Sequence, residues 1–457
     1  MVSVIYFDTR QEENQLNTLV AGALNRMTHR KARKLCELTG PAGAGKTQLI
    51  ANYVQSHAAS ARYFSCRQCR TPNAFAEFLH LFLPKEAAPS DWNAVFEKLG
   101  AAKNSRVPVL FIEDEECAPE EFRLGLDALH ERKLIVIHVT TSLRSGVLGS
   151  ENAAVPPRTI WHFKKALPAY TTADAARLWA ITGGLPAACK EADADLPLEE
   201  NLRRLLHFDS SLVTFFPALL TRTIRVPDSY YPILDALAHG KHRTSEIAKA
   251  AGYPNNKADT YLKALIERQI VAARKSQNDR SATYHLTNSY FRFWMLYIYP
   301  NRDRLIANPK SVLQTITQSI DKTLMLPEVQ GACLRYLQNF SYQSRTNDAY
   351  EFRWAASHDP QAYKPVSFTF KEDGYKAIID FASRYNGVTY LAAFPHDTER
   401  RFTKEDIERY YKVAAHYAPR YETRLLLFSF HRFSDWCVKE SAETQMLYCV
   451  PVERLKY

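Results

Sequence analysis

The segment "CELTGPAGAGKTQLIANYV", residues 36–54, joins an apolar run, a glycine-rich loop and an amphipathic segment. Within it, Gly40 to Thr47 reads GPAGAGKT and satisfies the pattern G-x-x-x-x-G-K-[ST] at every position. Leu49, Ile50 and Val54 follow at helical spacing. This order predicts a strand, a phosphate-binding loop and a helix that begins directly after the loop.

The residue types in this loop suit a nucleotide phosphate. Gly43 and Gly45 let the backbone curl so that several N–H groups converge on the phosphate oxygens, and the helix N-terminus adds its positive dipole end. Lys46 would reach the β- and γ-phosphates and assist catalysis, while the Thr47 hydroxyl would coordinate Mg²⁺. We therefore expect ATP and Mg²⁺ as cofactors. The expected nucleotide-binding residues are Gly40, Pro41, Ala42, Gly43, Ala44, Gly45, Lys46, Thr47 and Gln48.

A cluster of acids follows the apolar run Val107–Ile112, which reads as a strand buried on both faces. Next to the loop, one acid would hold Mg²⁺ and another would polarise the attacking water. The usual order is Asp then Glu directly after the strand. That register reads Glu113–Asp114 here, and Asp114–Glu115 requires a shift by one residue. We expect Asp114 to be the functional acid and a Mg²⁺ ligand, with Glu113 or Glu115 beside it; a solvated acidic strand end is the alternative.

A third apolar run, Leu134–Val139, predicts another buried strand. It is followed by Thr140, Thr141 and Ser142. Thr141 and Ser142 are candidates for sensing the γ-phosphate. Ordinary turn chemistry also places Thr and Ser after strands, so this alternative stays open.

Composition limits the class of protein. The chain has 457 residues, enough for two to four domains, and its formal net charge is +10. A basic surface favours an acidic partner such as nucleic acid, although many basic proteins are only well solvated. The sequence starts without a signal-peptide pattern and contains no apolar run long enough for a membrane helix. We expect a cytoplasmic protein with no membrane partner.

The loop, the acids and the third strand, in this order, resemble the AAA-type ATPases of the archaeal ATPase family, which are related to the STAND NTPases. Two further stretches carry the resemblance. "YFDTRQEENQL" is similar to the family's N-terminal box, with Arg10 and Glu13 just before a helix. "LWAITGGLPAACKEAD" matches the family's Gly-Gly-x-Pro segment at Gly183, Gly184 and Pro186.

The Gly-Gly-x-Pro segment also has a local physical interpretation. A helix ends at Thr182 with Gly183 as its C-cap, and Pro186 opens the next helix. The resemblance implies that this joint belongs to a helical lid that couples nucleotide state to the rest of the chain. It also implies an arginine finger, for which Arg158 in "PPRTIWHF" is the candidate and Arg144 a competitor.

Residues 227–287 read as short helices followed by two strands, the layout of a winged helix-turn-helix. If this element binds DNA, side chains of the third helix would face the major groove and the wing would contact the backbone. The candidate contacts are Lys257, Thr260, Tyr261 and Lys263 on the helix and Arg274 and Lys275 on the wing. The alternative is a winged helix that serves only as a packing module.

"NSYFRFWMLYIYPN", from Asn288, is close to the signature that opens the C-terminal domain of archaeal-type ATPases. The resemblance implies a restriction-endonuclease-like PD-(D/E)XK domain there. Asp380 fits the aspartate position, but Gln330 replaces the helix glutamate, and Ala393 and Pro395 stand where Glu-x-Lys is required. We therefore expect a binding module and no nuclease activity.

Taken together, the patterns predict an α/β P-loop NTPase with an AAA-like parallel sheet, a helical lid, a winged helix and a nuclease-like α/β domain. The predicted domains are 1–170, 171–226, 227–287 and 288–457. We expect an ATPase that acts as a nucleotide-dependent switch on nucleic acid or on a protein client. A scaffold with little hydrolysis is the main alternative, an ATP-driven nuclease is a less favoured one, and the oligomeric state is left open.

Overall fold

The structure is a computed structural model. It describes residues 5–28, 36–67, 109–120, 122, 135–141, 151–275, 281–338, 366–371, 374–385, 388–417, 422–444 and 446–455. The chain forms two compact units. Asp8–Pro157 is the N-terminal unit, and Met1–Phe7 together with Arg158–Tyr457 is the C-terminal unit. The predicted lid, winged helix and C-terminal domain fall within the second unit, and their boundaries remain predictions.

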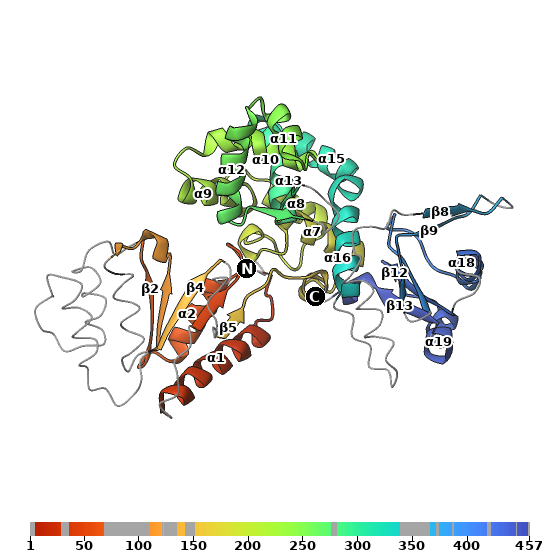
Figure 1. Ribbon diagram of the computed structural model, residues 1–457, viewed down its shortest axis with the longest axis horizontal. Coiled ribbons are helices and arrows are strands. Elements are labelled where there is room, and N and C mark those ends of the chain that lie inside the picture. Colours follow the sequence, from red (N-terminus) through yellow and green to blue (C-terminus); the bar gives the residue numbers. More distant parts are fainter. Residues whose placement is uncertain are drawn as a thin grey trace, which may run out of the picture. The chain divides into compact units, whose positions relative to one another are not determined.

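The N-terminal unit contains a five-stranded parallel sheet (Figure 1). Its strands are ordered β2-β3-β4-β1-β5. They are β1 (Cys36–Thr39), β2 (Ala61–Ser65), β3 (Val109–Glu113), β4 (Ile135–Thr140) and β5 (Glu151–Ala154). The three strands that the apolar runs predict are β1, β3 and β4, and they are adjacent in this sheet. Because all strands run in parallel, the segments that follow them lie at one edge.

Two helices, α1 (Arg10–Thr28) and α2 (Lys46–Ser56), cover one face of this sheet. Leu49 and Ile50 of α2 belong to the same buried cluster as Phe111 of β3. The ring of Tyr53 on α2 meets the ring of Phe111 edge-on, with centroids 5.4 Å apart. Side chains alternate between faces along a strand, so Ile112 points to the opposite face, where it is also buried. Burial on both faces confirms the prediction made for β3.

The C-terminal unit begins with helices that surround the Gly-Gly-x-Pro segment. They are α6 (Ile160–Ala166), α7 (Thr172–Thr182), α8 (Leu198–Leu205) and α9 (Ser211–Thr223). Helix α7 ends at Thr182 and Gly183 is its left-handed C-cap, which confirms the prediction. The N-terminal residues also belong to this unit, because the ring of Phe7 packs on that of Phe163 with centroids 4.9 Å apart.

Three helices and a two-stranded ribbon follow in the predicted winged-helix order. They are α10 (Tyr231–Ala238), α11 (Thr244–Ala251), α12 (Asn255–Glu267), β6 (Val271–Arg274) and β7 (Thr283–Leu286). The two strands pair in antiparallel fashion. Arg243 is the N-cap of α11, and the Glu246 carboxylate accepts a hydrogen bond from its backbone N–H. Gly252 closes α11 in the left-handed conformation.

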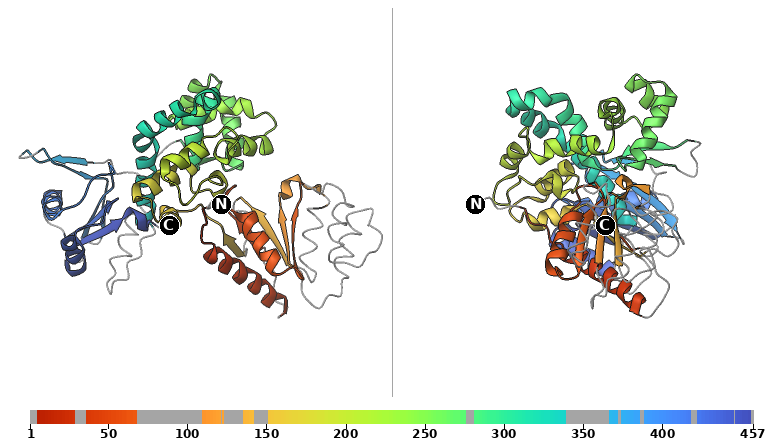
Figure 2. Two further views of the ribbon diagram at one scale, coloured as in Figure 1. Left: turned by 180° about the vertical axis from the view of Figure 1, so that it is seen from behind. Right: turned by 90° about the vertical axis from the view of Figure 1, so that its left-hand side faces the viewer.

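The remainder contains further helices and a four-stranded sheet ordered β10-β11-β12-β13. The helices are α13 (Ser289–Phe293), α14 (Arg302–Ala307), α15 (Pro309–Ile320), α16 (Leu326–Gln338), α18 (Lys404–Tyr417) and α19 (Asp435–Thr444). The strands are the hairpin β8 (Val366–Thr369) and β9 (Lys376–Ile379), and β10 (Phe381–Tyr385), β11 (Val388–Ala393), β12 (Glu422–Ser429) and β13 (Leu447–Pro451). Strand β10 is antiparallel to β11, and the other neighbours are parallel. Helices α18 and α19 cover one face of this sheet, opposite α16 (Figures 1 and 2).

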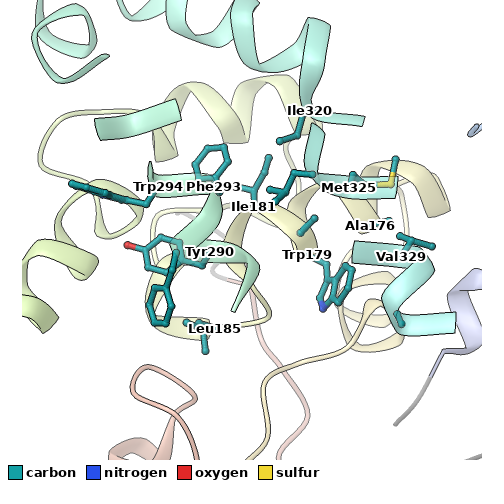
Figure 3. Close-up of a cluster of buried hydrophobic side chains, with 14 of the residues drawn as sticks. Ala176, Trp179, Ile181, Leu185, Tyr290, Phe293, Trp294, Ile320, Met325 and Val329 are labelled. Atoms are coloured by element: carbon teal, nitrogen blue, oxygen red, sulfur yellow. The ribbon is translucent and has the colours of Figure 1, made fainter. Parts of the chain in front are cut away.

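One hydrophobic cluster runs through the C-terminal unit, and Figure 3 shows its centre. The Tyr290 hydroxyl donates to the Leu212 carbonyl oxygen at 2.9 Å, and the Trp294 indole donates to the Val213 carbonyl oxygen at 2.8 Å. Phe291, Trp294 and Ile298 are buried in this cluster, whereas Leu296 is only partly buried. Trp294–Ile298 forms a π-helix that the sequence did not predict. Among the described residues, no helix has the length and apolarity needed to span a bilayer.

Candidate nucleotide site

The loop between β1 and α2 depends on its glycines. Gly43 and Gly45 have φ values of 81° and 104°, in the left-handed region that side chains with a Cβ rarely adopt. Gly40 is required for a different reason, since a Cβ there would lie 2.3 Å from the carbonyl oxygen of Val155. Gly45 is the N-cap of α2, so the helix starts at Lys46 as predicted.

Lys46 lies inside the loop that it would serve. Its ammonium donates to the carbonyl oxygens of Gly40, at 2.6 Å, and Pro41, at 3.1 Å, and the residue is only 7% exposed. Thr47 and Gln48 are exposed in the first turn of α2. The structure thus joins a buried cation, an exposed hydroxyl and a helix N-terminus at the edge of the sheet, which is the chemistry that a Mg²⁺–phosphate group needs.

The three acids at the end of β3 contact two different neighbouring strands. Glu113 is the last residue of β3 and shares the face of Phe111, which α2 covers; its carboxylate accepts from the Tyr63 hydroxyl. Asp114 has a φ of 60° and accepts from the Ser65 hydroxyl at 3.1 Å. The Arg67 guanidinium also contacts Asp114, at 3.0 Å. Tyr63 and Ser65 belong to β2 and Arg67 follows it, so the contacts of Glu113 and Asp114 lie on the β2 side of β3.

Glu115 turns the other way. Its carboxylate contacts Nδ1 of His138, which lies on β4, between β3 and β1. His138 is 2% exposed and its register partner on β1 is Glu37, which is 0% exposed. The sequence patterns did not predict four of the residues at this edge, namely Glu37, Ser65, Arg67 and His138. A polar residue inside an apolar run, as in "CELT" and "IVIHVT", was the signal that could have identified Glu37 and His138.

The candidates for γ-phosphate sensing and for the arginine finger lie in different parts of the chain. Thr141 is exposed just after β4, whereas Ser142 and Arg144 lie outside the described residues. Arg158 belongs to the C-terminal unit and is 3% exposed. Its backbone N–H donates to the Gly184 carbonyl oxygen at 2.7 Å, and its carbonyl oxygen accepts from the Trp179 indole at 3.0 Å. Its role as an arginine finger remains a prediction.

Several nucleic-acid candidates on α12 have partners within the chain. The Lys257 ammonium lies 4.0 Å from the ring centroid of Tyr253 and 5.5 Å from that of Tyr261. Tyr261 is partly buried and stacks on Tyr230, at 4.4 Å between centroids. Lys263 pairs with Asp259 at 2.8 Å. These contacts hold the two lysines close to the helix surface.

The other candidates for nucleic-acid contact are also exposed, as are Lys257 and Lys263. Thr260 is exposed on α12, and its hydroxyl donates to the Asn256 carbonyl oxygen at 3.0 Å. Arg274 and Lys275 are exposed at the end of β6. The candidates on α12 and on the ribbon therefore belong to one element made of α10, α11, α12, β6 and β7, which we call the helix-and-ribbon element.

Asp380 accepts hydrogen bonds from residues of the predicted C-terminal domain. Its two carboxylate oxygens accept from the Phe394 backbone N–H, at 2.7 Å, and from Nε2 of His396, at 2.8 Å. Gln330 donates to the Pro395 carbonyl oxygen at 2.9 Å. Hydrogen bonding to Asp380 raises the pKa of His396. Nowhere in the part of the chain that the structure describes do three or more His, Cys, Asp or Glu side chains gather as metal ligands.

The N-terminal unit has a glycine-rich loop of the phosphate-binding type after β1 and the strand order β2-β3-β4-β1-β5. These two features define it as an AAA+-like α/β P-loop fold.

No protein-family profile matches the chain. An uncharacterised protein of Methanocaldococcus jannaschii is 24% identical over 152 residues, which cover 32% of this chain and 34% of that relative.

Two solved structures can be set beside the chain. The Orc1 protein of Aeropyrum pernix in complex with DNA is 16% identical and has a TM-score of 0.33, covering 66% of this chain and 95% of that one. The RuvB Holliday junction branch migration motor of Thermotoga maritima is 14% identical and has a TM-score of 0.30, covering 57% and 89%.

Proposed function

We propose that the chain is an ATP-hydrolysing switch. The observation that carries the proposal is the loop from Gly40 to Thr47, where left-handed glycines, buried Lys46 and the start of α2 converge. ATP would bind through the loop backbone and Lys46, and Mg²⁺ through Thr47 and an acid of the turn after β3. Asp114 is the first candidate for that acid, and Glu113, on the face that α2 covers, is the second.

The proposal extends to what the switch controls. The chain passes between its two units at Phe7–Asp8 and again at Pro157–Arg158. Arg158, the first residue after the second crossing, is bonded to the Gly-Gly-x-Pro segment. A change in nucleotide state would therefore reach the C-terminal unit through two covalent connections, one of which enters this joint.

Substitution of Lys46 tests the nucleotide site. Lys46→Ala removes the cation that would reach the β- and γ-phosphates. We expect ATP affinity to fall about tenfold or more and ATP turnover to be lost, because a phosphate contact with a cation is charge-assisted. Isothermal titration and a phosphate-release assay measure both quantities. Exposed Lys310 on α15 supplies the control, and Lys310→Ala should change neither. Unchanged affinity and turnover in Lys46→Ala would exclude the proposal.

A scaffold that binds ATP and barely hydrolyses it is the second candidate function. The contacts of Ser65 and Arg67 with Asp114 favour it, because a carboxylate already held by a hydroxyl and a guanidinium must be released before it can hold Mg²⁺ or orient a water molecule. Steady-state hydrolysis well above background that is abolished by Asp114→Ala would rule out the scaffold. Background turnover in both proteins, with ATP still bound, would support it.

We further propose nucleic acid as the partner of the helix-and-ribbon element. Basic residues outnumber acidic ones between Lys241 and Arg280, which suits contact with phosphates. Changing Lys257, Lys263 and Arg274 to alanine should weaken binding to duplex DNA of any sequence and lower the salt slope by about one for each lost contact. Fluorescence anisotropy at several salt concentrations measures this. Lys412→Ala, an exposed change on α18, is the control, and an equal loss there would contradict the assignment.

A further inference from the structure

A buried polar pair crosses the strands beneath the phosphate loop. Glu37 on β1 and His138 on β4 are register partners, so both side chains point to the same face of the sheet. They are 0% and 2% exposed. Leu38 and Val139, the next residues along each strand, point to the face that α1 and α2 cover. Burying polar groups in a sheet is costly unless they are hydrogen-bonded, so the contacts of these two side chains matter for the sheet.

The acid turn supplies one partner of His138. Glu115 begins the short 3₁₀ helix Glu115–Cys117 directly after Asp114, and its carboxylate contacts Nδ1 of His138. Ile112 of β3 is the register partner of His138 on the other side. His138 therefore stands on the strand that separates the acid-bearing strand β3 from the loop-bearing strand β1. The carboxylate of Glu115 thus contacts this intervening strand.

We propose that Glu115 is the acid that orients the attacking water and that His138 is its positioning residue. This inference rests on the proposed ATPase function. A contact between a buried imidazole and a carboxylate is strong and directional, because little water competes with it. Strand β4 is paired to β1 from Ile137 to Thr140, so His138 fixes Glu115 relative to the loop that follows β1. A displacement of about 1 Å at such a group can cost about 100-fold in rate, so loss of this support would be visible in kcat.

The test separates kcat from nucleotide affinity. His138→Leu removes the polar partner and should lower kcat for ATP hydrolysis about tenfold or more, while ATP affinity measured by titration stays within about twofold. His138→Gln keeps an N–H donor for the carboxylate and should recover part of the loss. Glu115→Gln should lower kcat as well, and the double variant with His138→Leu should be no slower than Glu115→Gln alone. A purely structural histidine would produce additive losses instead.

A second ion pair in the same unit provides the control. Arg26 on α1 and Glu151 on β5 pair at 2.5 Å, away from the loop and the acid turn. Arg26→Leu should lower the melting temperature and leave kcat unchanged. Wild-type kcat in both His138→Gln and Glu115→Gln would overturn the inference. The ATPase proposal would still stand in that case if Lys46→Ala abolished turnover, so the two failures are distinguishable.

Discussion

At the scale of single residues, two adjacent glycines form a close-packed joint in the C-terminal unit. Gly183 has a φ of 61°, and a Cβ there would lie 1.6 Å from Oδ1 of Asn288. The Asn288 amide also donates to the Gly183 carbonyl oxygen at 2.9 Å. Gly184 has a φ of 70°, and a Cβ there would lie 2.1 Å from the carbonyl oxygen of Arg158. The Gly-Gly-x-Pro motif thus brings residue 158 and the start of α13 into contact with the end of α7.

Alanine substitution separates backbone strain from steric clash at this joint. Gly184→Ala should lower the free energy of unfolding by about 3 kcal/mol, since the left-handed conformation costs about 1–2 kcal/mol and overpacking adds about 1–3 kcal/mol. Gly252, with a φ of 69° and open space around its Cβ position, is the matched control. Gly252→Ala should cost only about 1 kcal/mol. Urea denaturation measures both, and equal losses would contradict the role of the Arg158 contact.

At the scale of secondary-structure elements, a pair of histidines ties the ribbon to the loop before α11. The rings of His242 and His285 stack with centroids 4.2 Å apart. Nδ1 of His242 lies 2.9 Å from the carbonyl oxygen of Tyr284 on β7. Burial lowers the pKa of His285 to about 4, and the positive charges of His242 and Arg274 add to the effect. The ribbon is therefore most stable with a neutral His285.

This arrangement predicts acid sensitivity of the helix-and-ribbon element. The pKa of an unfolded histidine is about 6.5, and the folded value of His285 is about 4. The unfolded state therefore binds the proton first, so the stabilisation is complete above about pH 6.5 and is lost as the pH falls toward 4. His285→Phe keeps a ring for stacking and should flatten this dependence. Thermal melts at pH 7.5 and pH 4.5 compare the two proteins, and an identical pH dependence would argue against His285.

At the scale of the whole molecule, the main hydrophobic cluster of the C-terminal unit contains residues from the first and the last described segments of the chain. Ile5 and Phe7 belong to its main hydrophobic cluster, as do Val452 and Leu455. The Thr172 hydroxyl on α7 also donates to the Glu453 carboxylate at 3.2 Å. This cluster includes side chains from the helices after residue 158, from the helix-and-ribbon element and from one face of the β10–β13 sheet. We therefore expect these parts to unfold together.

Truncation of a C-terminal side chain tests that cooperativity. Leu455→Ala removes a side chain that is 0% exposed and should destabilise the whole C-terminal unit by about 2–4 kcal/mol. Hydrogen exchange should then increase in α7 and α10 as well as in β13, whereas the N-terminal sheet keeps its protection. Met446, which is 40% exposed, provides the control, and Met446→Ala should have little effect. Faster exchange confined to β13 would contradict a shared core.

Local patterns predicted much of the fold. The loop, α2, the end of α7 at Thr182 and the strands β3 and β4 all follow from residue periodicity and glycine placement, which act over a few neighbouring residues. The π-helix Trp294–Ile298 was missed because helical periodicity does not reveal an added residue in a turn. The contact of Asp380 with His396 was missed because it forms between side chains that are close only after β11 pairs with β10.

By itself, the sequence determined the phosphate loop of this protein. Its chemistry is carried by contiguous residues from Gly40 to Thr47, whose turn depends on the left-handed Gly43 and Gly45 and on the helix that follows. Only the tertiary structure decided how the acids after β3 are directed. The strand order sets β2 on one side of β3 and β4 on the other, so Asp114 meets Ser65 while Glu115 meets His138. Adjacent residues acquire different partners because neighbouring strands come from distant parts of the chain.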